Sequence, residues 1–281
     1  MRWTAGGRSD DLEDRRDEGG GGGFGGMHIG IGGFLILLVL SVVFKKDFFS
    51  LIGGQGVSTG PAVSQPDPQR DAREEPTVQF VSFVLDDTQK TWAGIFQQRG
   101  IPYQHAKLVL FRDVTSSGCG TAQSATGPFY CPEDQKVYID LGFYDELQRR
   151  FGAPGQFAQA YVLSHELGHH VQNLLGIERK VRSLQGSNPG SENSLSVRLE
   201  LQADCFAGVW AKSTQQRNLL EAGDVESALG AAAAVGDDRL QRMSRGRVSP
   251  DSFTHGTSAQ RTEWFQRGMN GGTIESCNTF Q

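Results

Sequence analysis

The sequence contains only four cysteines among 281 residues, and no two of them form a CxxC pair. Disulfide bonds are the simplest explanation for cysteines at these spacings. Cys119 and Cys131 flank a short stretch rich in Gly, Ser and Thr that would form a stapled hairpin, which leaves Cys205 to pair with Cys277. Sequence alone permits three connectivities, and four reduced, buried thiols are the alternative.

The sequence also lacks a basic run. Its formal net charge is −5, and the Lys and Arg residues are scattered rather than gathered into a stripe that would bind phosphate groups. This distribution argues against nucleic acid as the main partner. The sequence does not indicate an oligomeric state.

Hydrophobic residues are relatively scarce, at 37% of the chain. The deficit is local, because residues 1–26 are charged and Gly-rich, and residues 47–76 include a long stretch rich in Gly, Pro, Ser and Gln. We predict that 1–26 is a separate N-terminal segment and that 47–76 is a flexible linker. Residues 77–281 have an ordinary composition and are predicted to form one catalytic domain.

Long apolar runs are absent except for one, from Met27 to Phe44, which has no charged residue and is followed by Lys45 and Lys46. At about 1.5 Å per residue, this run reaches roughly 27 Å as a helix, which is just enough for one bilayer crossing. We predict that residues 27–46 form a transmembrane anchor. A cleaved signal peptide is the alternative, but its charged region would be unusually long and acidic.

Charge alone does not orient this anchor, because Arg8, Arg15 and Arg16 precede the span and two lysines follow it. All four cysteines come after the span, and disulfides form in oxidising compartments. We therefore expect a single-pass membrane protein with a cytoplasmic N-terminus and a periplasmic or extracellular catalytic domain.

Helical periodicity dominates the region after the linker. Apolar residues recur at spacings of three and four in the predicted helix 77–98. A Pro at the start and Gly176 at the end bound a predicted helix at 154–175, and further helices are predicted at 194–211, in the Ala-rich segment 222–235 and at 258–267. Runs of Leu, Val and Ile predict buried strands at 105–111 and 137–141. Residues 176–193 are polar and are predicted to form a loop, with Asn193 capping the next helix. The predicted fold class is α+β, mostly helical with a small β-sheet.

The motif SHELGHH lies on the predicted helix 154–175 and has the spacing of a zinc site. His165 and His169 are four residues apart, so both imidazoles project from one helix face, about 6 Å apart at Cβ. Glu166 lies about 100° around the helix from His165, where a base for an attacking water is needed. Gly168 is unfavourable inside a helix, which indicates the close approach of another backbone.

A second motif, RLELQAD, supplies the missing ligand. Glu200 and Asp204 are again four residues apart and share one helix face. Two His and one Glu make up the three protein ligands of a catalytic zinc, and Asp204 is predicted to orient His165 by a hydrogen bond. The alternative is a solvated helix face, which the apolar neighbours Leu199 and Phe206 argue against.

HELGHH followed by ELQAD resembles the HExxH plus ExxxD pattern of gluzincin metallopeptidases. More narrowly, the chain is similar to the putative neutral zinc metallopeptidase family of bacterial membrane-anchored proteins. That likeness covers most of residues 77–281, including CPEDQKVYIDL and HGTSAQRTEWF, and also the Gly-rich head and the anchor. It implies a zincin-like domain in which His165, His169 and Glu200 bind zinc and Glu166 is the catalytic base. It does not imply a substrate.

Other candidate residues have weaker signals. His255 is predicted to donate a hydrogen bond to the oxyanion at the attacked carbonyl, with a packed loop histidine as the alternative. Arg261 on the last helix is interpreted as a surface charge, with a substrate contact as the alternative. His170 and His105 are interpreted as structural. Residues 128–141 form either an edge strand that binds an extended peptide or an ordinary hairpin strand.

These residues together predict a zinc-dependent peptidase whose partners are a peptide or protein substrate and the membrane. Glu166 would take the proton from water and pass it to the leaving amine. A non-catalytic zinc-binding scaffold at the cell envelope is the main alternative, and a fully buried metal with four protein ligands would support it. An intramembrane protease is disfavoured, because the zinc helix carries Gln156, Gln159 and Gln172.

Overall fold

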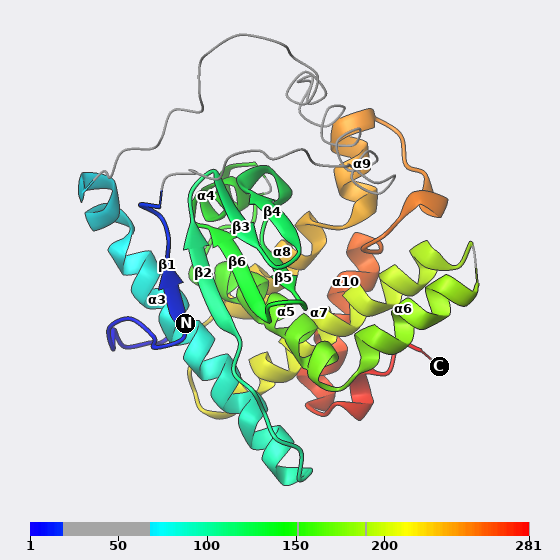
Figure 1. Cartoon of the computed structure of the whole chain (residues 1–281), viewed down its shortest axis with the longest axis horizontal. Coiled ribbons are helices and arrows are strands. Elements are labelled where there is room, and N and C mark those ends of the chain that lie inside the picture. The colour runs from blue at the N-terminus through cyan, green and yellow to red at the C-terminus, as the bar shows by residue number, and fades with distance from the viewer. Residues whose placement is uncertain (19–67, 151, 189, 281) are drawn as a thin grey trace.

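The computed structural model describes residues 1–18 and 68–280, apart from residues 151 and 189 (Figure 1). Its helices are α3 (Pro68–Gln98), α4 (Gly142–Arg149), α5 (Gln156–Leu174), α6 (Ile177–Ser187), α7 (Glu192–Gln216), α8 (Asp224–Ala234), α9 (Asp237–Arg245) and α10 (Ser258–Gly271). Its strands are β1 (Leu12–Asp14), β2 (Lys107–Phe111), β3 (Val114–Ser117), β4 (Gly120–Gln123), β5 (Phe129–Cys131) and β6 (Lys136–Asp140). The predicted α+β class, mostly helical with small sheets, is confirmed.

The main sheet has the strand order β1-β2-β6-β5. β1, β2 and β6 are parallel, whereas β5 runs antiparallel to β6 and forms one edge. Leu108 pairs with Val137 and Leu110 pairs with Ile139, so alternate residues of the two central strands point to the same face. Both predicted strands are therefore present, at 107–111 and 136–140.

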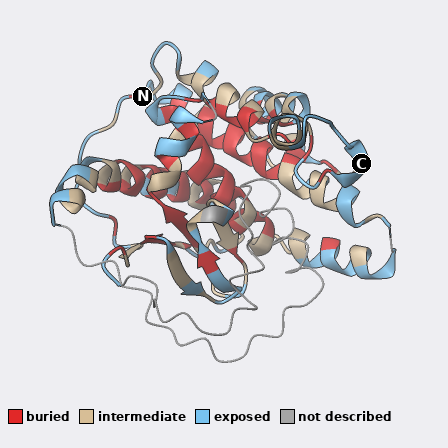
Figure 2. Ribbon diagram, turned by 90° about the horizontal axis from the view of Figure 1, so that it is seen from above, coloured by how far each residue is buried: buried red, intermediate tan, exposed pale blue. Residues whose placement is uncertain are grey.

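Both faces of the sheet are buried, which explains why its central strands are continuously apolar. On one face, Leu108 and Leu110 pack into a core shared with α3, α5 and α7. On the other face, Val109 and Phe111 pack with Ala122 of the β3–β4 hairpin. Figure 2 shows the buried residues running through the central helices and the sheet.

Helices α7 and α10 approach each other closely because glycine lies at their crossing. A Cβ on Gly208 would be 2.1 Å from the carbonyl oxygen of Phe265, and one on Gly268 would be 1.9 Å from that of Cys205. No side chain fits at either position without moving a backbone. This contact fixes the second site helix, α7, against the C-terminal part of the domain.

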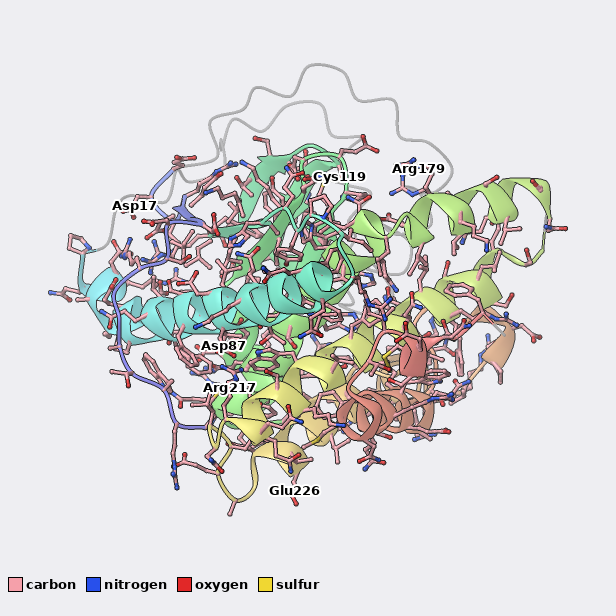
Figure 3. The ribbon with its side chains drawn as sticks, turned by 90° about the horizontal axis from the view of Figure 1, so that it is seen from below. Asp17, Asp87, Cys119, Arg179, Arg217 and Glu226 are labelled. Atoms are coloured by element: carbon pink, nitrogen blue, oxygen red, sulfur yellow. A yellow bond between two sulfur atoms is a disulfide. The ribbon has the colours of Figure 1, made fainter. Side chains whose placement is uncertain are left out.

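Two disulfide bonds join the pairs that the spacing favoured. Cys119–Cys131 connects the β3–β4 turn to the end of β5 (Cys119 is labelled in Figure 3), and Cys205–Cys277 connects α7 to the 3-10 turn Glu275–Cys277 after α10. All four cysteines are bonded. The alternative of four reduced thiols is wrong.

The ordered structure extends beyond the predicted 77–281 domain. Leu12–Asp14, expected in a separate N-terminal segment, is strand β1 of the main sheet. α3 begins at Pro68, nine residues before the predicted helix and within the predicted linker, with Pro68 at its first position and Pro76 inside it. Residues 1–18 and 68–76 thus belong to the same folded body as the residues after them.

Two local predictions were also wrong. Residues 177–187, predicted as loop, form α6, whose one fully buried side chain is Val181. α7 begins at Glu192 after Ser191, and no side chain caps it, so Asn193 is not its N-cap. Instead, the Asn193 side chain donates to the backbone carbonyl of Asp251 at 2.9 Å.

The predicted anchor, residues 27–46, lies outside the described residues. Among the residues that are described, no helix has the length and apolar character needed to cross a membrane.

Candidate metal centre

Two neighbouring helices carry the predicted metal ligands. α5 presents His165 and His169 on one face, and α7 presents Glu200 toward them; a ligand atom of each lies within 4.8 Å of the other two. Nε2 of His165 is 3.2 Å from Oε2 of Glu200, and Nε2 of His169 is 3.5 Å from Oε1 of Glu200. The structure therefore brings together the two imidazoles and the carboxylate that the sequence singled out.

These separations fit the ligands of one zinc ion. An ion about 2.1 Å from two ligands at the tetrahedral angle holds those ligands about 3.4 Å apart, close to both measured distances. Both imidazoles turn Nε2 toward the carboxylate and engage Nδ1 elsewhere, which leaves the Nε2 lone pairs available to a metal. Two His and one Glu leave one coordination position for water or substrate.

The outer nitrogen of His165 contacts Asp204, one turn after Glu200 on α7. Nδ1 of His165 lies 2.9 Å from Oδ1 of Asp204, a side chain with no exposed surface. A carboxylate here accepts a hydrogen bond from Nδ1–H of His165. This bond fixes the tautomer whose Nε2 is free to bind a metal. This is the contact that the four-residue spacing of Glu200 and Asp204 predicted.

The outer nitrogen of His169 contacts an amide. Nδ1 lies 2.9 Å from Oε1 of Gln172, whose Nε2 donates to the Leu199 carbonyl at 2.8 Å and to the Gln202 side chain at 3.1 Å. Gln202 in turn donates to the Cys277 carbonyl at 2.9 Å. We call His169, Gln172, Gln202 and the Cys277 carbonyl the His169 relay; it connects a metal ligand to a disulfide-bonded residue.

Asp204 also belongs to a buried cluster with Tyr161 and Arg261, which we call the Asp204 cluster. Arg261 donates to both carboxylate oxygens, from Nε at 2.8 Å and from Nη2 at 3.0 Å, and the Tyr161 hydroxyl donates to Oδ1. Arg261 is only 4% exposed. The interpretation of Arg261 as a surface charge is therefore wrong: it neutralises the acid that contacts His165.

The cluster sets the charges of the site before metal binds. Although burial lowers it, the carboxylates of Asp204 and Glu200 raise the pKa of His165 to about 10. Burial raises the pKa of Asp204, but Arg261 and His165 lower it by more, so this pKa lies below its ordinary value. The pKa of Glu200 is likewise lowered by the histidines around it, against the effect of burial. A metal ion bound to Nε2 of His165 would therefore have to displace a proton.

Gly168 allows the two helices to approach. A Cβ at this position would lie 3.0 Å from the carbonyl oxygen and 3.1 Å from Cα of Ala203 on α7. The absence of a side chain sets the spacing of α5 and α7, and so the distance between the histidines and Glu200. The close approach predicted from a glycine inside the zinc helix is present.

The three ligands lie in the wall of a cleft of about 480 Å³. Glu166, one residue after His165, is in the same wall and is 8% exposed. Residues 126–130, before and within the edge strand β5, form another part of the wall together with Phe143. Glu166 and the ligands thus face a space that is large enough for a segment of peptide.

His255 lines the cleft as well, from the loop between α9 and α10. Its backbone N–H donates to Oδ2 of Asp237 at 2.6 Å, and its ring Nδ1 lies 3.3 Å from Oδ1 of the same residue. Although burial lowers it, Glu200 and Asp237 raise the pKa of His255. His255 therefore lies at the site, and its contacts with Asp237 fix its position.

The remaining histidines have other contacts. His170 is fully buried; Nε2 lies 2.7 Å from the Gln104 carbonyl and Nδ1 lies 3.0 Å from the Tyr130 hydroxyl. His105 lies before β2 and contacts Asp11 at 2.6 Å. His28 lies outside the described residues.

Four residues of the site were missed in the sequence: Tyr161, Gln172, Gln202 and Asp237, which contacts His255. Tyr161 and Gln172 lie on the zinc helix, one turn before His165 and one turn after His169, and this spacing was the available signal. Gln202 has no such signal, because its partner, the Cys277 carbonyl, is a backbone atom far along the chain.

The sequence matches the model of the family described as “Putative neutral zinc metallopeptidase” over residues 1–280. It is 51% identical over 287 residues to the Escherichia coli K12 protein named “Uncharacterized protein YpfJ”, covering 100% of this chain and 99% of the relative. It is 46% identical over 189 residues to the Mycobacterium tuberculosis H37Rv protein named “Uncharacterized protein Rv2575”, covering 63% of each chain. No solved structure matches the chain.

Proposed function

Because the chain belongs to the family described as “Putative neutral zinc metallopeptidase”, we propose that it hydrolyses peptide bonds with zinc held by His165, His169 and Glu200. The observation that best supports this proposal is the convergence of the three side chains, from two helices, in the wall of a cleft that also contains Glu166. Ligands, a candidate base and a substrate-sized space therefore occur together.

His165, His169 and Glu200 would hold the zinc ion, which when bound would lower the pKa of a water molecule to about 7 and polarise a carbonyl oxygen. Glu166 accepts the proton of the attacking water and then donates it to the leaving amine. His255, in the same cleft, donates a hydrogen bond to the oxyanion that develops at the attacked carbonyl. Asp204 and Gln172 act through the histidines, whose orientation they fix.

The peptide is proposed to lie along β5. This strand pairs with β6 on one side and lies at one of the two edges of the described sheet, and Phe129 and Tyr130 line the cleft. An extended peptide adds to such an edge through backbone hydrogen bonds that are independent of its sequence. This mode supports cleavage inside a chain rather than removal of terminal residues.

A non-catalytic zinc-binding scaffold is the alternative from another class. It would be supported by a fourth protein ligand and a closed site, whereas the only group of three or more metal-binding side chains among the described residues contains three. Glu200 and His169 each retain about 20% exposure, at 19% and 20% of their side chains. The site therefore favours an open coordination position.

The experiment that tests the peptidase proposal is the substitution Glu166→Gln. The variant is expected to bind one equivalent of zinc, as measured by metal analysis, and to cleave no member of a peptide library that the wild-type protein cleaves. Glu263→Gln, an exposed substitution on α10, is the control and should retain cleavage. Cleavage by the Glu166→Gln variant, or cleavage by wild-type protein that persists after zinc is removed, would rule out this mechanism.

The location of the protein is also a proposal. The two disulfide bonds support an oxidising compartment, periplasmic or extracellular, for the catalytic domain. The apolar run at 27–44 supports attachment to a membrane. Fractionation of cells, with thiol alkylation before lysis, tests both points.

A further inference from the structure

The N-terminal residues 1–18 form an integral part of the sheet. β1 pairs with β2 in parallel, and the backbone N–H of Leu108 donates to the Asp11 carbonyl at 2.8 Å, while that of Arg15 donates to the Leu110 carbonyl at 2.8 Å. These two hydrogen bonds lie at the two ends of β1 and extend its pairing with β2 by one residue at each end. These bonds join a segment that precedes the predicted anchor to a strand that follows it.

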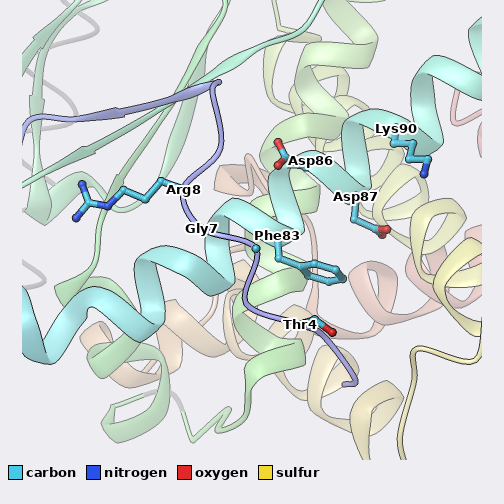
Figure 4. A pocket seen from close by; sticks show the side chains of 8 residues that line it. Thr4, Gly7, Arg8, Phe83, Asp86, Asp87 and Lys90 are labelled. Atoms are coloured by element: carbon cyan, nitrogen blue, oxygen red, sulfur yellow. The ribbon is translucent and has the colours of Figure 1, made fainter.

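Side chains before β1 also pack on the domain. Trp3 lies against Phe80 and Phe83 of α3, with ring centroids 5.3 Å and 6.2 Å apart, and the Ser9 hydroxyl donates to Asp86 at 2.5 Å. Figure 4 shows this segment passing along α3, with Gly7 next to Phe83. A small cavity of about 230 Å³ remains between the segment and the helix. The contact is a docked interface that runs along the helix.

A cluster of charges ties the two flanks of the anchor to one corner of the domain. Arg16, buried at the end of the first segment, donates to Asp14 at 2.8 Å and to Glu74 in α3 at 2.7 Å. Arg112, after β2, donates to the Arg16 carbonyl at 3.1 Å and to Asp71 at 2.6 Å. We call Asp14, Arg16, Asp71, Glu74 and Arg112 the corner cluster. The described chain leaves this corner after residue 18 and returns to it at residue 68.

We infer that residues 1–18 and residues 68–280 lie on the same side of the membrane. A single crossing by residues 27–46 would place β1 and β2 on opposite sides, separated by a hydrocarbon core about 30 Å thick. The β1–β2 pairing and the Arg16–Glu74 ion pair cannot form across that distance. The single-pass orientation with a cytoplasmic N-terminus is therefore incompatible with the docked segment.

The length of the apolar run gives this inference a further consequence. One crossing needs about 20 residues, so the eighteen residues from Met27 to Phe44 suffice for one crossing but not for two. A single-pass anchor therefore cannot connect two flanks that share one side. The match to the family covers residues 1–280, so the docked segment and the run are included in it.

Thiol labelling of the full-length protein tests the inference. All four native cysteines are disulfide-bonded, so single cysteines introduced at exposed positions report without background: Thr4→Cys in the first segment and Ser183→Cys in α6. A membrane-impermeant maleimide is applied to intact spheroplasts and to lysed membranes. In each preparation we expect the two cysteines to be either both labelled by the maleimide or both protected from it. Labelling of one position and protection of the other in spheroplasts would overturn the inference.

A crosslink provides a second measurement. Ser9→Cys combined with Asp86→Cys replaces two side chains in hydrogen-bond contact, so a disulfide is expected to form in the membrane-bound protein and to appear as one crosslinked peptide by mass spectrometry. Either single variant is the control. Absence of residues 1–18 from the isolated protein, or recovery of the whole protein in the soluble fraction, would also overturn the inference. None of these readouts depends on zinc or on peptidase activity.

Discussion

Oε1 of Gln172 lies 2.9 Å from Nδ1 of His169, one turn further along the same helix. The amide cannot flip, because its Nε2 donates to both the Leu199 carbonyl and Gln202. Its oxygen is therefore fixed toward the imidazole, which must carry its proton on Nδ1 and present Nε2 to the metal.

Gln172→Leu removes this acceptor while keeping a similar volume. We expect zinc affinity to fall about 10-fold to 100-fold, because His169 loses the bond that fixes its tautomer and orientation. Competition with a chromogenic chelator measures the change. Gln159→Leu, at a half-buried position earlier on α5, is the matched control, and an equal loss in both variants would contradict a specific role for Gln172.

The Asp204–Arg261 ion pair is fully buried, so removing one partner leaves an uncompensated charge. Asp204→Asn is expected to lower the free energy of unfolding by about 3–5 kcal/mol, and Asp204→Asn with Arg261→Gln by less than the sum of the single changes. Urea unfolding measures both. Arg217→Gln breaks a pair with Asp87 in which the arginine is 39% exposed, and should cost only about 1 kcal/mol (Figure 3). Additive losses at positions 204 and 261 would contradict their coupling.

Gly168→Ala inserts a methyl group between α5 and α7. We expect a loss of about 1–3 kcal/mol in the free energy of unfolding, because Ala203 must move, and weaker zinc binding, because the histidines move away from Glu200. Gly230→Ala in α8 is the matched control; its Cβ meets nothing within 4 Å, so the substitution should stabilise by about 0.5–1 kcal/mol. Equal effects of the two substitutions would show that helix propensity alone is responsible.

The periodicity of a helix explains why much of the site is predictable. His165 and His169, like Glu200 and Asp204, share a face because four residues make about one turn, and this relation needs no knowledge of the rest of the chain. The meeting of the two faces depends on Gly168, which the sequence also shows. The spacing of residues along a helix is therefore sufficient to predict the candidate metal ligands.

The unpredicted parts depend on distant partners. β1 has the sequence LED, with no apolar alternation, and it is held by bonds to β2 and by Lys136, which contacts Glu13 at 2.7 Å. Arg261 resembles a surface residue until its burial against Asp204 is known. Periodicity carries no information about such contacts, because they join segments far apart in the sequence.

The corner cluster makes the docking of the first segment sensitive to acid. Although burial raises it, hydrogen bonds from Arg16 and Arg70 hold the pKa of Glu74 below its ordinary value of 4.5. The pKa of Asp14 is also held below its ordinary value by Arg16, against the effect of burial. These groups bind more protons when undocked, so docking is fully stabilised above the ordinary pKa values and weakens as pH falls below them.

We therefore expect protease cleavage within residues 1–18 to accelerate as the pH is lowered from about 6 to about 3, before the rest of the domain unfolds. An acid-active protease and mass spectrometry give the rate. Glu74→Gln should flatten this dependence, whereas Asp145→Asn, an exposed change on α4, should leave it unchanged. A pH profile that is identical in wild type and Glu74→Gln would assign the sensitivity to other groups.

Removal of the two disulfide bonds should have different effects on zinc affinity. Replacing Cys205 and Cys277 by Ser frees the backbone whose carbonyl ends the His169 relay, so zinc affinity should fall about 10-fold. Replacing Cys119 and Cys131 by Ser removes a bond at the far side of the sheet and should change stability without this loss. Equal zinc affinity in the two double variants would show that the relay does not need the bond.

The carbonyl of Cys277 that ends the His169 relay comes after α10 in the sequence, and α10 packs on α7. A chain emerging from a ribosome exposes HELGHH well before the atoms that orient it. We therefore expect tight zinc binding only once the C-terminal residues have packed, so that the ion has to be available where the last helix packs rather than where synthesis begins.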